Sequence, residues 1–268
     1  MALYKFGFIG AGNMGGALAS AVCKKQKNEV VLCDAVEEKA TALALKLGCN
    51  SAKIFDVVKN SKYIFLGVKP QVMQSVIDEI KPVLETRSDR FILVTMAAGI
   101  KIESFNEMLS TKYPIIRIMP NTPVSVGKGM ILYSLCKAIT VEEEREFCFA
   151  LEEAGMLDKL PEELIDAGCA VSGCGPAFVY LFAKHLASAG ENCGLEPEKA
   201  IKYAAQTLSG AAELLLSSEH SADELIDMVC SPGGSTIEGV KSFNASTFEE
   251  DIKTAVKASF EKTKLLGK

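Results

Sequence analysis

The 268-residue sequence lacks the features that mark several large classes of protein. No uninterrupted apolar run reaches the ~18 residues of a membrane-spanning helix. The first residues do not show the basic region, apolar stretch and cleavage site of a secretory signal. Acids and bases are interleaved, with a net charge of −5 and no long basic run. We therefore expect a cytoplasmic protein whose partners include neither a membrane nor a nucleic acid.

Histidine is scarce, and the nine cysteines form no CxxC pair. Metal centres need clustered ligands at short spacing, so the sequence predicts no metal. Isolated cysteines in apolar or helical settings are typical of small core residues that stay reduced. The two histidines, His185 and His220, lie in a predicted helix and in a polar turn. We expect neither histidine to act in catalysis.

Compact β-prone runs alternate with amphipathic helical patterns over residues 1–160. The predicted strands are Lys5–Ile9, Val30–Cys33, Tyr63–Gly67, Phe91–Thr95, Ile115–Ile118 and Gly129–Tyr133. The helical patterns between them include Met14–Lys25, Val36–Leu47 and Gln71–Leu84. This alternation favours an α/β fold with a doubly wound parallel sheet that helices cover on both faces.

Residues 161–268 show no convincing strand and are predicted to form a second, all-helical domain. The expected helices are Phe178–Ala189, Glu198–Leu216, Ala222–Cys230 and Phe248–Leu266. Two stretches, Ala177–Ala183 and Ala200–Leu216, are apolar nearly all round. A helix without a polar face is buried, and a domain of this size has little room to bury two. The sequence therefore predicts a homo-oligomer whose subunits meet through the helical domain.

The strongest motif is the glycine-rich turn Gly10-Ala11-Gly12-Asn13-Met14-Gly15, which follows the first predicted strand and opens a helix. In a dinucleotide-binding turn, the first glycine permits the tight bend and the second lets the backbone approach the pyrophosphate. The third glycine lets helix and strand pack closely. The phosphates bind at the positive end of the helix. We therefore predict a Rossmann-type dinucleotide-binding domain over residues 1–160.

Asp34 ends the second predicted strand, nineteen residues after Gly15. A carboxylate at this spacing accepts hydrogen bonds from the adenosine ribose and repels a 2′-phosphate. Glu37 and Glu38 add negative charge, so the sequence favours NADH over NADPH. The alternative is that Asp34 caps the next helix.

Several sequence blocks together resemble the pyrroline-5-carboxylate reductase family, in family order across nearly the whole chain. These blocks are Gly7–Leu18, Val68–Gln71, Met96–Ile100, Arg117–Pro123, Glu162–Ala167, Ser172–Ala177 and Ser231–Thr236. The resemblance implies hydride transfer from NAD(P)H to the C=N bond of 1-pyrroline-5-carboxylate, giving L-proline in the last step of proline biosynthesis. It also implies an amino-terminal Rossmann domain and a helical domain through which subunits form dimers or larger assemblies.

The same resemblance assigns site residues by position. Cofactor contacts are expected at Ile9, Gly10, Ala11, Gly12, Asn13, Met14, Gly15, Asp34, Val68, Lys69, Pro70, Ala97, Ala98, Gly99 and Asn121. Substrate contacts are expected at Glu162, Val229, Ser231, Gly233, Gly234, Ser235 and Thr236, with Thr236 as the catalytic residue. For Lys69 the alternative is an ordinary loop lysine, and for Glu162 a solvated glutamate in the first turn of a helix.

The Ser231–Thr236 stretch also makes physical sense as a carboxylate site. Pro232 closes one helix, the glycines free the backbone, and Ser235 and Thr236 begin the next helix. Successive N–H groups at a helix start bind an anion, here the substrate carboxylate. A cyclic imine can arrive already protonated, so its reduction needs no dedicated acid–base pair. That chemistry agrees with a sequence in which no histidine demands a catalytic role.

Two other functions remain open at this stage. A β-hydroxyacid dehydrogenase also joins a Rossmann domain to a helical domain and uses a helical lysine as proton donor. Lys184 is the candidate, but its neighbourhood does not match that family. A dinucleotide sensor or scaffold would bind cofactor without turnover, and it would have no need of the Ser231–Thr236 stretch.

Overall fold

The computed structural model describes residues 3–266, which form two compact units. The first unit runs to Cys174 and includes the carboxy-terminal stretch from Ser259, whereas the second comprises Gly175–Ala258. The predicted boundary between residues 160 and 161 lies inside the first of these units.

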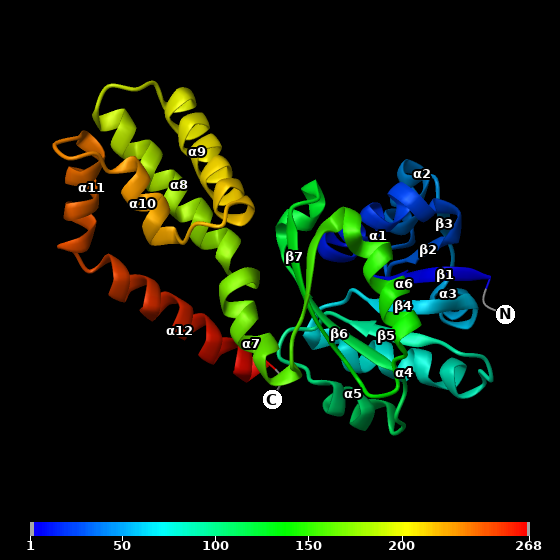
Figure 1. Ribbon diagram of the computed structural model, residues 1–268. Helices are drawn as coiled ribbons and strands as arrows, with labels where there is room; N and C mark the ends of the chain where they lie inside the picture. Colours follow the sequence, from blue (N-terminus) through cyan, green and yellow to red (C-terminus); the bar gives the residue numbers. More distant parts are fainter. Residues whose placement is uncertain (1–2, 267–268) are drawn as a thin grey trace. The chain divides into compact units, whose positions relative to one another are not determined.

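An eight-stranded sheet forms the centre of the first unit, in the order β3-β2-β1-β4-β5-β6-β7-β8 (Figure 1). Its strands are β1 Tyr4–Ile9, β2 Val30–Cys33, β3 Asn50–Ser51, β4 Ser61–Leu66, β5 Ile92–Thr95, β6 Ile115–Pro120, β7 Gly129–Leu135 and β8 Gly155–Lys159. The α/β fold with a mostly parallel sheet is thereby confirmed. The sequence did not predict the short edge strand β3 or the strand β8.

The pair β6 and β7 is antiparallel, which the predicted parallel sheet did not include. Residues 121–128 connect the two strands and contain only the short 3₁₀ helix η2 Thr122–Val126. A parallel connection needs a crossover of about a dozen residues or more, so a link this short returns the chain in the opposite direction.

Helices cover both faces of the sheet, as predicted. The helices of this unit are α1 Asn13–Gln26, α2 Glu37–Leu47, α3 Ile54–Asn60, α4 Pro70–Glu85, α5 Ile102–Leu109, α6 Val141–Leu151 and α7 Ile165–Gly168. One apolar core joins α1, α2 and α6 to a face of the sheet that includes Phe8 and Phe65. A second core joins α3, α4 and α5 to the opposite face, which includes Ile9 and Leu66. Alternate residues of each strand thus enter different cores.

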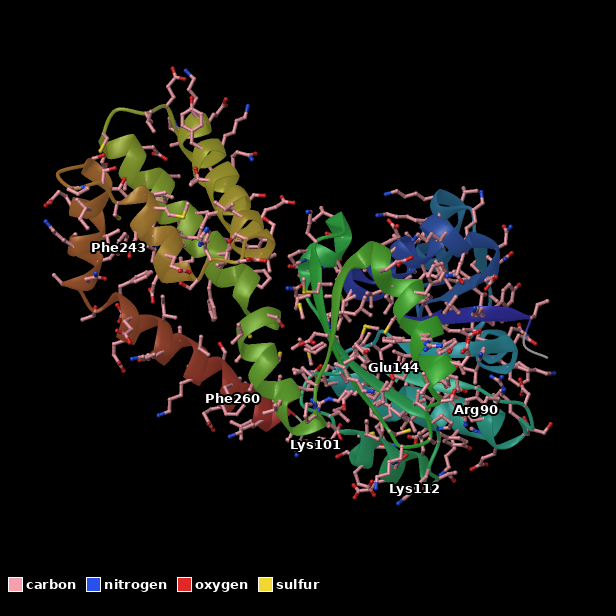
Figure 2. The ribbon with its side chains drawn as sticks, in the orientation of Figure 1. Arg90, Lys101, Lys112, Glu144, Phe243 and Phe260 are labelled. Carbon is pink, nitrogen blue, oxygen red and sulfur yellow. The ribbon has the colours of Figure 1, made fainter. Side chains whose placement is uncertain are left out.

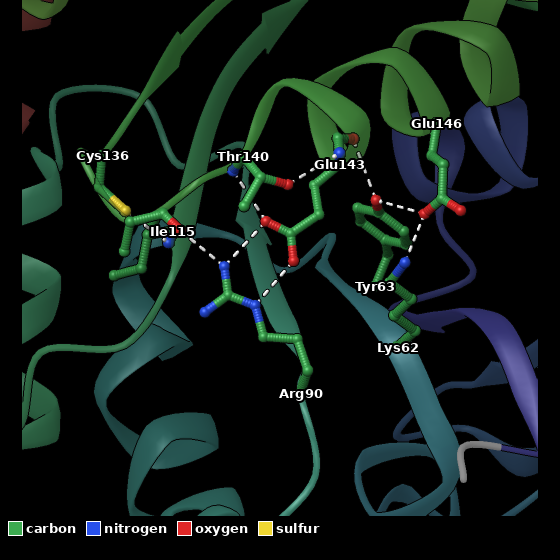
Figure 3. Close-up of polar contacts among 9 residues, drawn as sticks. Lys62, Tyr63, Arg90, Ile115, Cys136, Thr140, Glu143 and Glu146 are labelled. Carbon is green, nitrogen blue, oxygen red and sulfur yellow. Dashed lines mark hydrogen bonds and ion pairs between the residues drawn. The ribbon is translucent and has the colours of Figure 1, made fainter.

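Helix α6 begins with a capping box in which Thr140 and Glu143 satisfy each other's backbone N–H groups. Arg90 donates two hydrogen bonds to the Glu143 carboxylate, at 2.7 and 2.8 Å (Figure 3). The guanidinium is the main reason that the pKa of Glu143 falls to about 2. The buried Tyr63 hydroxyl donates to the Glu143 carbonyl oxygen and so ties α6 to β4. The sequence analysis had not identified this helix.

The second unit consists of helices, and no strand occurs between residues 161 and 266. Its helices are α8 Gly175–Asn192, α9 Pro197–Ser217, α10 Ala222–Val229, α11 Ser235–Asn244 and the first part of α12 Phe248–Leu266. The buried core between α8 and α9 consists of Ala187, Ala200 and Ala204. Many large apolar side chains are instead exposed, among them Val179, Tyr180, Leu181, Ile201, Tyr203, Leu214, Leu215, Met228 and Phe243, the last labelled in Figure 2.

One described helical stretch, Glu162–Asn192, is long and apolar enough to cross a membrane by length and composition. Its most apolar window has a mean hydropathy of 1.4. A single such stretch is weak support for a membrane span, because an apolar helix of a soluble protein passes the same test. The expectations of no membrane partner, no nucleic acid and a cytoplasmic location stay predictions.

Candidate functional site

The glycine-rich turn lies where the strand order of the sheet reverses, between β1 and β4. The Gly10 N–H donates to the Cys33 carbonyl oxygen at the end of β2, at 2.8 Å. The Gly67 N–H, just after β4, donates to the Ile9 carbonyl oxygen, also at 2.8 Å. The carboxyl ends of three parallel strands therefore meet around one turn. Open α/β sheets bind ligands at such a reversal point.

Each glycine of the turn meets a different requirement. Gly10 has a φ of +100°, in the region that side chains disfavour. A Cβ on Gly15 would lie 2.1 Å from the Gly10 carbonyl oxygen, so helix α1 can approach the turn only without a side chain there. A Cβ on Gly12 would meet no protein atom within 4 Å. The backbone conformation requires glycine at Gly10, and the packing of α1 requires it at Gly15. No protein atom fills the space beside Gly12, so that space is open to a ligand.

The first turn of α1 is free to bind an anion. Gly12 is its N-cap, no side chain caps its amides, and no acidic residue lies in its first turn. The first N–H groups of a helix have no partner inside the helix and carry part of its positive dipole. A phosphate group beside Gly12 would satisfy both features.

A cavity of about 720 Å³ adjoins this turn, in the range typical of small-molecule sites. Five predicted cofactor residues line it: Ile9, Gly10, Asp34, Val68 and Lys69. Its other lining residues include Ser51, Lys53 and Ile54 from the segment after β2. Burial is the main cause that raises the pKa of the Cys33 thiol to about 12. That cysteine therefore lines the cavity as a neutral thiol.

Asp34 connects the end of β2 to the glycine-rich turn. One carboxylate oxygen accepts a hydrogen bond from the Ala11 N–H at 2.7 Å. The other accepts from the N–H of Val36, the N-cap of α2, at 3.0 Å. The carboxylate lines the cavity and also holds the turn beside it, so the suggested capping contact and a position suited to ribose binding coexist.

Several other predicted cofactor residues do not line this cavity. Asn13, Met14 and Gly15 form the start of α1, and Pro70 is the first residue of α4. Ala97, Ala98 and Gly99 follow β5, with Ala97 buried and Gly99 at a φ of +79°. Their placement after parallel strands agrees with the predicted roles, which stay predictions.

Asn121 uses both ends of its amide within the protein. Its Nδ2 donates to the Ser172 carbonyl oxygen and its Oδ1 accepts from the Met130 N–H, both at 2.9 Å. Pro176 has no N–H to donate back to that carbonyl, and a π-helical turn, Cys169–Gly173, precedes α8 here. The structure thus shows Asn121 as a link between β6 and this turn, and its cofactor contact stays a prediction.

Glu162 begins the 3₁₀ helix η4 Glu162–Leu164, and its carboxylate is engaged within the protein. Its Oε1 accepts from the Ile102 N–H at 2.7 Å and lies 3.4 Å from Nη1 of Arg117. A freely solvated glutamate, the suggested alternative, is therefore not what the structure shows. Arg117 begins one of the blocks that resemble the family, but the sequence assigned it no role, because the sequence of an apolar strand does not indicate what a single arginine contacts.

The predicted substrate residues of the second unit form one turn between α10 and α11. Gly233 has a φ of +71°, and the Gly234 N–H donates to the Ser231 carbonyl oxygen at 2.9 Å. Gly234 is the N-cap of α11, whose first amides receive no side-chain cap. Ser231, Ser235 and Thr236 are exposed, as is Val229 at the end of α10. The turn has the open backbone that the carboxylate prediction needs. Glu162 belongs to the first unit.

Strand order, the glycine-rich turn at the reversal point and the uncapped start of α1 together define a Rossmann-type dinucleotide-binding protein. Residues 5–99 match the family model of the coenzyme F420-dependent NADP oxidoreductases, an independent sign of the same class. Residues 162–266 match the model of the pyrroline-5-carboxylate reductase dimerisation domain. Together with the relatives described next, these matches show that the chain belongs to the pyrroline-5-carboxylate reductase family.

A pyrroline-5-carboxylate reductase of Aquifex aeolicus is 34% identical over 264 residues, covering 98% of this chain and 97% of the relative. The crystal structure of a Plasmodium falciparum pyrroline carboxylate reductase with NADP bound superposes with a TM-score of 0.87 at 30% identity, covering 100% of both chains. The structure of a Coxiella burnetii pyrroline-5-carboxylate reductase gives a TM-score of 0.91 at 26% identity, covering 99% of both chains.

Proposed function

We propose that this protein is a pyrroline-5-carboxylate reductase, which converts 1-pyrroline-5-carboxylate, NAD(P)H and a proton into L-proline and NAD(P)⁺. This is the last step of proline biosynthesis. The observation that carries the proposal is full-length membership of the family together with two uncapped, glycine-bearing helix starts, one in each unit.

A nicotinamide dinucleotide fits the residues of the first unit. The open space beside Gly12 and the uncapped amides of α1 would take its pyrophosphate, and Asp34 would accept hydrogen bonds from its adenosine ribose. The backbone after β4 and β5, including Val68 and Ala97–Gly99, would flank the rest of the molecule. When bound, the reduced nicotinamide supplies hydride to the carbon of a C=N bond.

The turn before α11 would hold the substrate. Backbone N–H groups of Ser235 and Thr236 bind its carboxylate, and Gly233 allows the chain to bend around it. The Gly234 N–H, which resemblance to the family also assigned to the carboxylate, donates instead to the Ser231 carbonyl oxygen and holds the turn. The Thr236 hydroxyl oxygen accepts a hydrogen bond from the protonated ring nitrogen and so orients the imine. Holding both reactants in a fixed orientation supplies most of the catalysis, because a protonated imine accepts hydride directly.

Asp34 favours NADH over NADPH. The carboxylate lines the cavity beside Glu37, and a 2′-phosphate placed there would meet two negative charges. The cationic residues that line the cavity are Lys53 and Lys69. We expect Asp34→Ser to raise kcat/KM for NADPH relative to NADH by about tenfold. An unchanged ratio in steady-state kinetics would contradict the ribose role. Glu79→Gln, which removes another charge from the cavity, serves as the control.

The second unit serves as the oligomerisation domain. Its large exposed apolar side chains and an apolar groove of about 820 Å³ on α8, lined by residues such as Phe178, Phe182 and Phe248, are more than a monomer's surface usually carries. A homo-oligomer, dimer or larger, would bury them. Size-exclusion chromatography with light scattering tests this, and a monomer at micromolar concentration would contradict it.

The main experiment measures oxidation of NADH and of NADPH by the purified protein, with and without 1-pyrroline-5-carboxylate. We expect oxidation that depends on this substrate. Oxidation with β-hydroxyacids or their keto forms as sole substrates would favour the dehydrogenase alternative. Dinucleotide binding without any turnover would favour a sensor.

A further inference from the structure

Arg117 is a fully buried arginine in the middle of β6. Thr95 and Ser134 lie directly beside it on β5 and β7, and both are buried too. A charged side chain without solvent costs several kcal/mol unless partners compensate it. The free-energy cost of burying this charge indicates that Arg117 does more than fill the core.

Two carboxylates compensate the Arg117 guanidinium. Its Nη2 lies 2.6 Å from Oδ1 of Asp166 on α7, and its Nη1 lies 3.4 Å from Oε1 of Glu162. The Nε has no hydrogen-bond partner among the described residues. The planar guanidinium can reach two separate acceptors at once, which a lysine ammonium on a flexible stem does less well.

The Glu162 oxygen that faces Arg117 also accepts the Ile102 N–H, at 2.7 Å. Ile102 is the first residue of α5 and follows the turn of residues 96–101, which leaves β5. At the other end of this turn, the Ala97 N–H lies 3.4 Å from the Thr95 hydroxyl, beside Arg117 on the sheet. The Glu162 carboxylate therefore holds the far end of the turn, and the Thr95 hydroxyl contacts its near end.

We propose that Arg117, through Glu162, is a positioning residue that fixes the turn of residues 96–101 and with it the nicotinamide-facing backbone at Ala97–Gly99. This inference rests on the proposed function, in which that backbone flanks the dinucleotide. Asp166 holds the guanidinium, the guanidinium holds Glu162, and Glu162 holds the start of α5. Arg117 touches neither substrate nor cofactor in this role.

Arg117→Lys tests the role, because it keeps the positive charge but loses the planar guanidinium that reaches both carboxylates. We expect kcat to fall on the order of ten- to hundredfold while KM for the dinucleotide stays within about threefold. With NADH deuterated at the transferred position, the primary isotope effect on kcat should rise, since misplacement slows hydride transfer itself. A loss of folded enzyme would lower kcat without changing the isotope effect.

Arg90→Lys is the matched control. Arg90 also makes a bidentate ion pair with a mostly buried glutamate, Glu143, but neither residue lines the cavity. We expect it to lower thermal stability and leave the isotope effect unchanged. Equal isotope effects in wild type and Arg117→Lys, with activity lost only in proportion to the folded fraction, would overturn the proposal.

A second measurement does not depend on activity. Hydrogen exchange of the Ile102 amide should be at least about tenfold faster in Arg117→Lys than in wild type, since its acceptor is released. Should that variant fail to fold, Asp166→Asn is measured in its place with the same expectation. Unchanged protection of Ile102 would overturn the proposal. An inactive but folded wild type would contradict the proposed function, and the exchange measurement would still decide the role of Arg117.

Discussion

Two helix starts that carry glycine, one in each unit, face different demands. The turn before α1 is built into the sheet, and its Gly10 and Gly15 are required by backbone contacts of the protein. The turn before α11 is exposed, and a Cβ on Gly233 would meet no atom within 4 Å. Contacts within the protein fix the backbone of the first turn, whereas the second turn has an open backbone with few contacts of its own.

This difference predicts how the two sites fail. Damage to the turn before α1 should reach the whole first unit, because strands β1, β2 and β4 meet there. Damage to the exposed turn should stay local and affect chemistry more than stability. The predictions below test that contrast, beginning with the variant expected to lose most stability.

Gly15→Ala should have the largest effect. Its Cβ would lie 2.1 Å from the Gly10 carbonyl oxygen, so the start of α1 must move away from the sheet. We expect a loss of more than about 3 kcal/mol in the free energy of unfolding, together with loss of dinucleotide binding. Urea denaturation of Gly15→Ala beside Gly239→Ala, an open position in α11, measures it. Equal stability of the two variants would show that the turn is not fixed as described.

Gly12→Ala separates binding from stability within the same turn. No protein atom opposes its Cβ, so the free energy of unfolding should change by less than about 1 kcal/mol. The dinucleotide Kd should rise at least about tenfold, because the methyl group occupies the space meant for the pyrophosphate. Calorimetric titration checks this. Unchanged affinity would place the pyrophosphate elsewhere.

Thr236→Ala is the corresponding change in the exposed turn. We expect kcat to fall by about a hundredfold with the dinucleotide Kd and the melting temperature near wild type. Ser242→Ala, on the same helix, is the control. If both variants keep full turnover, Thr236 has no part in the reaction.

Acid should distinguish the two units by a smaller effect. The folded-state pKa of Glu143 lies near 2, below its ordinary value, so its contribution to stability is complete above about pH 4.5 and is lost as pH falls toward 2. We expect this loss to be about 2 kcal/mol, and Glu143→Gln to remove that pH dependence. In the second unit, Glu224 also has a lowered pKa, from the Ser221 N–H, but it is fully exposed. Glu224→Gln should leave the acid unfolding curve nearly unchanged.

Local patterns predicted the parts of the fold that local chemistry determines. The strand Val30–Cys33 has the predicted bounds, and the glycine-rich turn stands at the reversal point of the sheet as expected. Strand β3 has only two residues and β8 is half-exposed, so neither carries a strong apolar pattern. The capping-box pattern of Thr140 and Glu143 is typical of a helix start, but α6 was not predicted from it.

The contacts that shape the site could not be predicted in the same way. The Arg117–Asp166 pair joins residues 49 positions apart, and the Asp34–Ala11 bond joins residues 23 positions apart. Such pairs form only once the sheet brings their strands together. The spacing after Gly15 indicated that Asp34 lies near the turn but not that it accepts the Ala11 N–H, and no spacing rule relates Arg117 to Asp166. The sequence therefore indicated five of the residues that line the cavity and gave no role to the buried Arg117.

In the proposed function, the turn before α1 binds the dinucleotide and the turn before α11 binds the cyclic imine that is reduced. The most direct test incubates the protein with 1-pyrroline-5-carboxylate and NADH deuterated at the transferred position, and then analyses proline by mass spectrometry. We expect L-proline with one deuterium per molecule, on the ring carbon next to nitrogen that does not bear the carboxylate. Dinucleotide oxidation without labelled proline, or no oxidation with either dinucleotide, would contradict it.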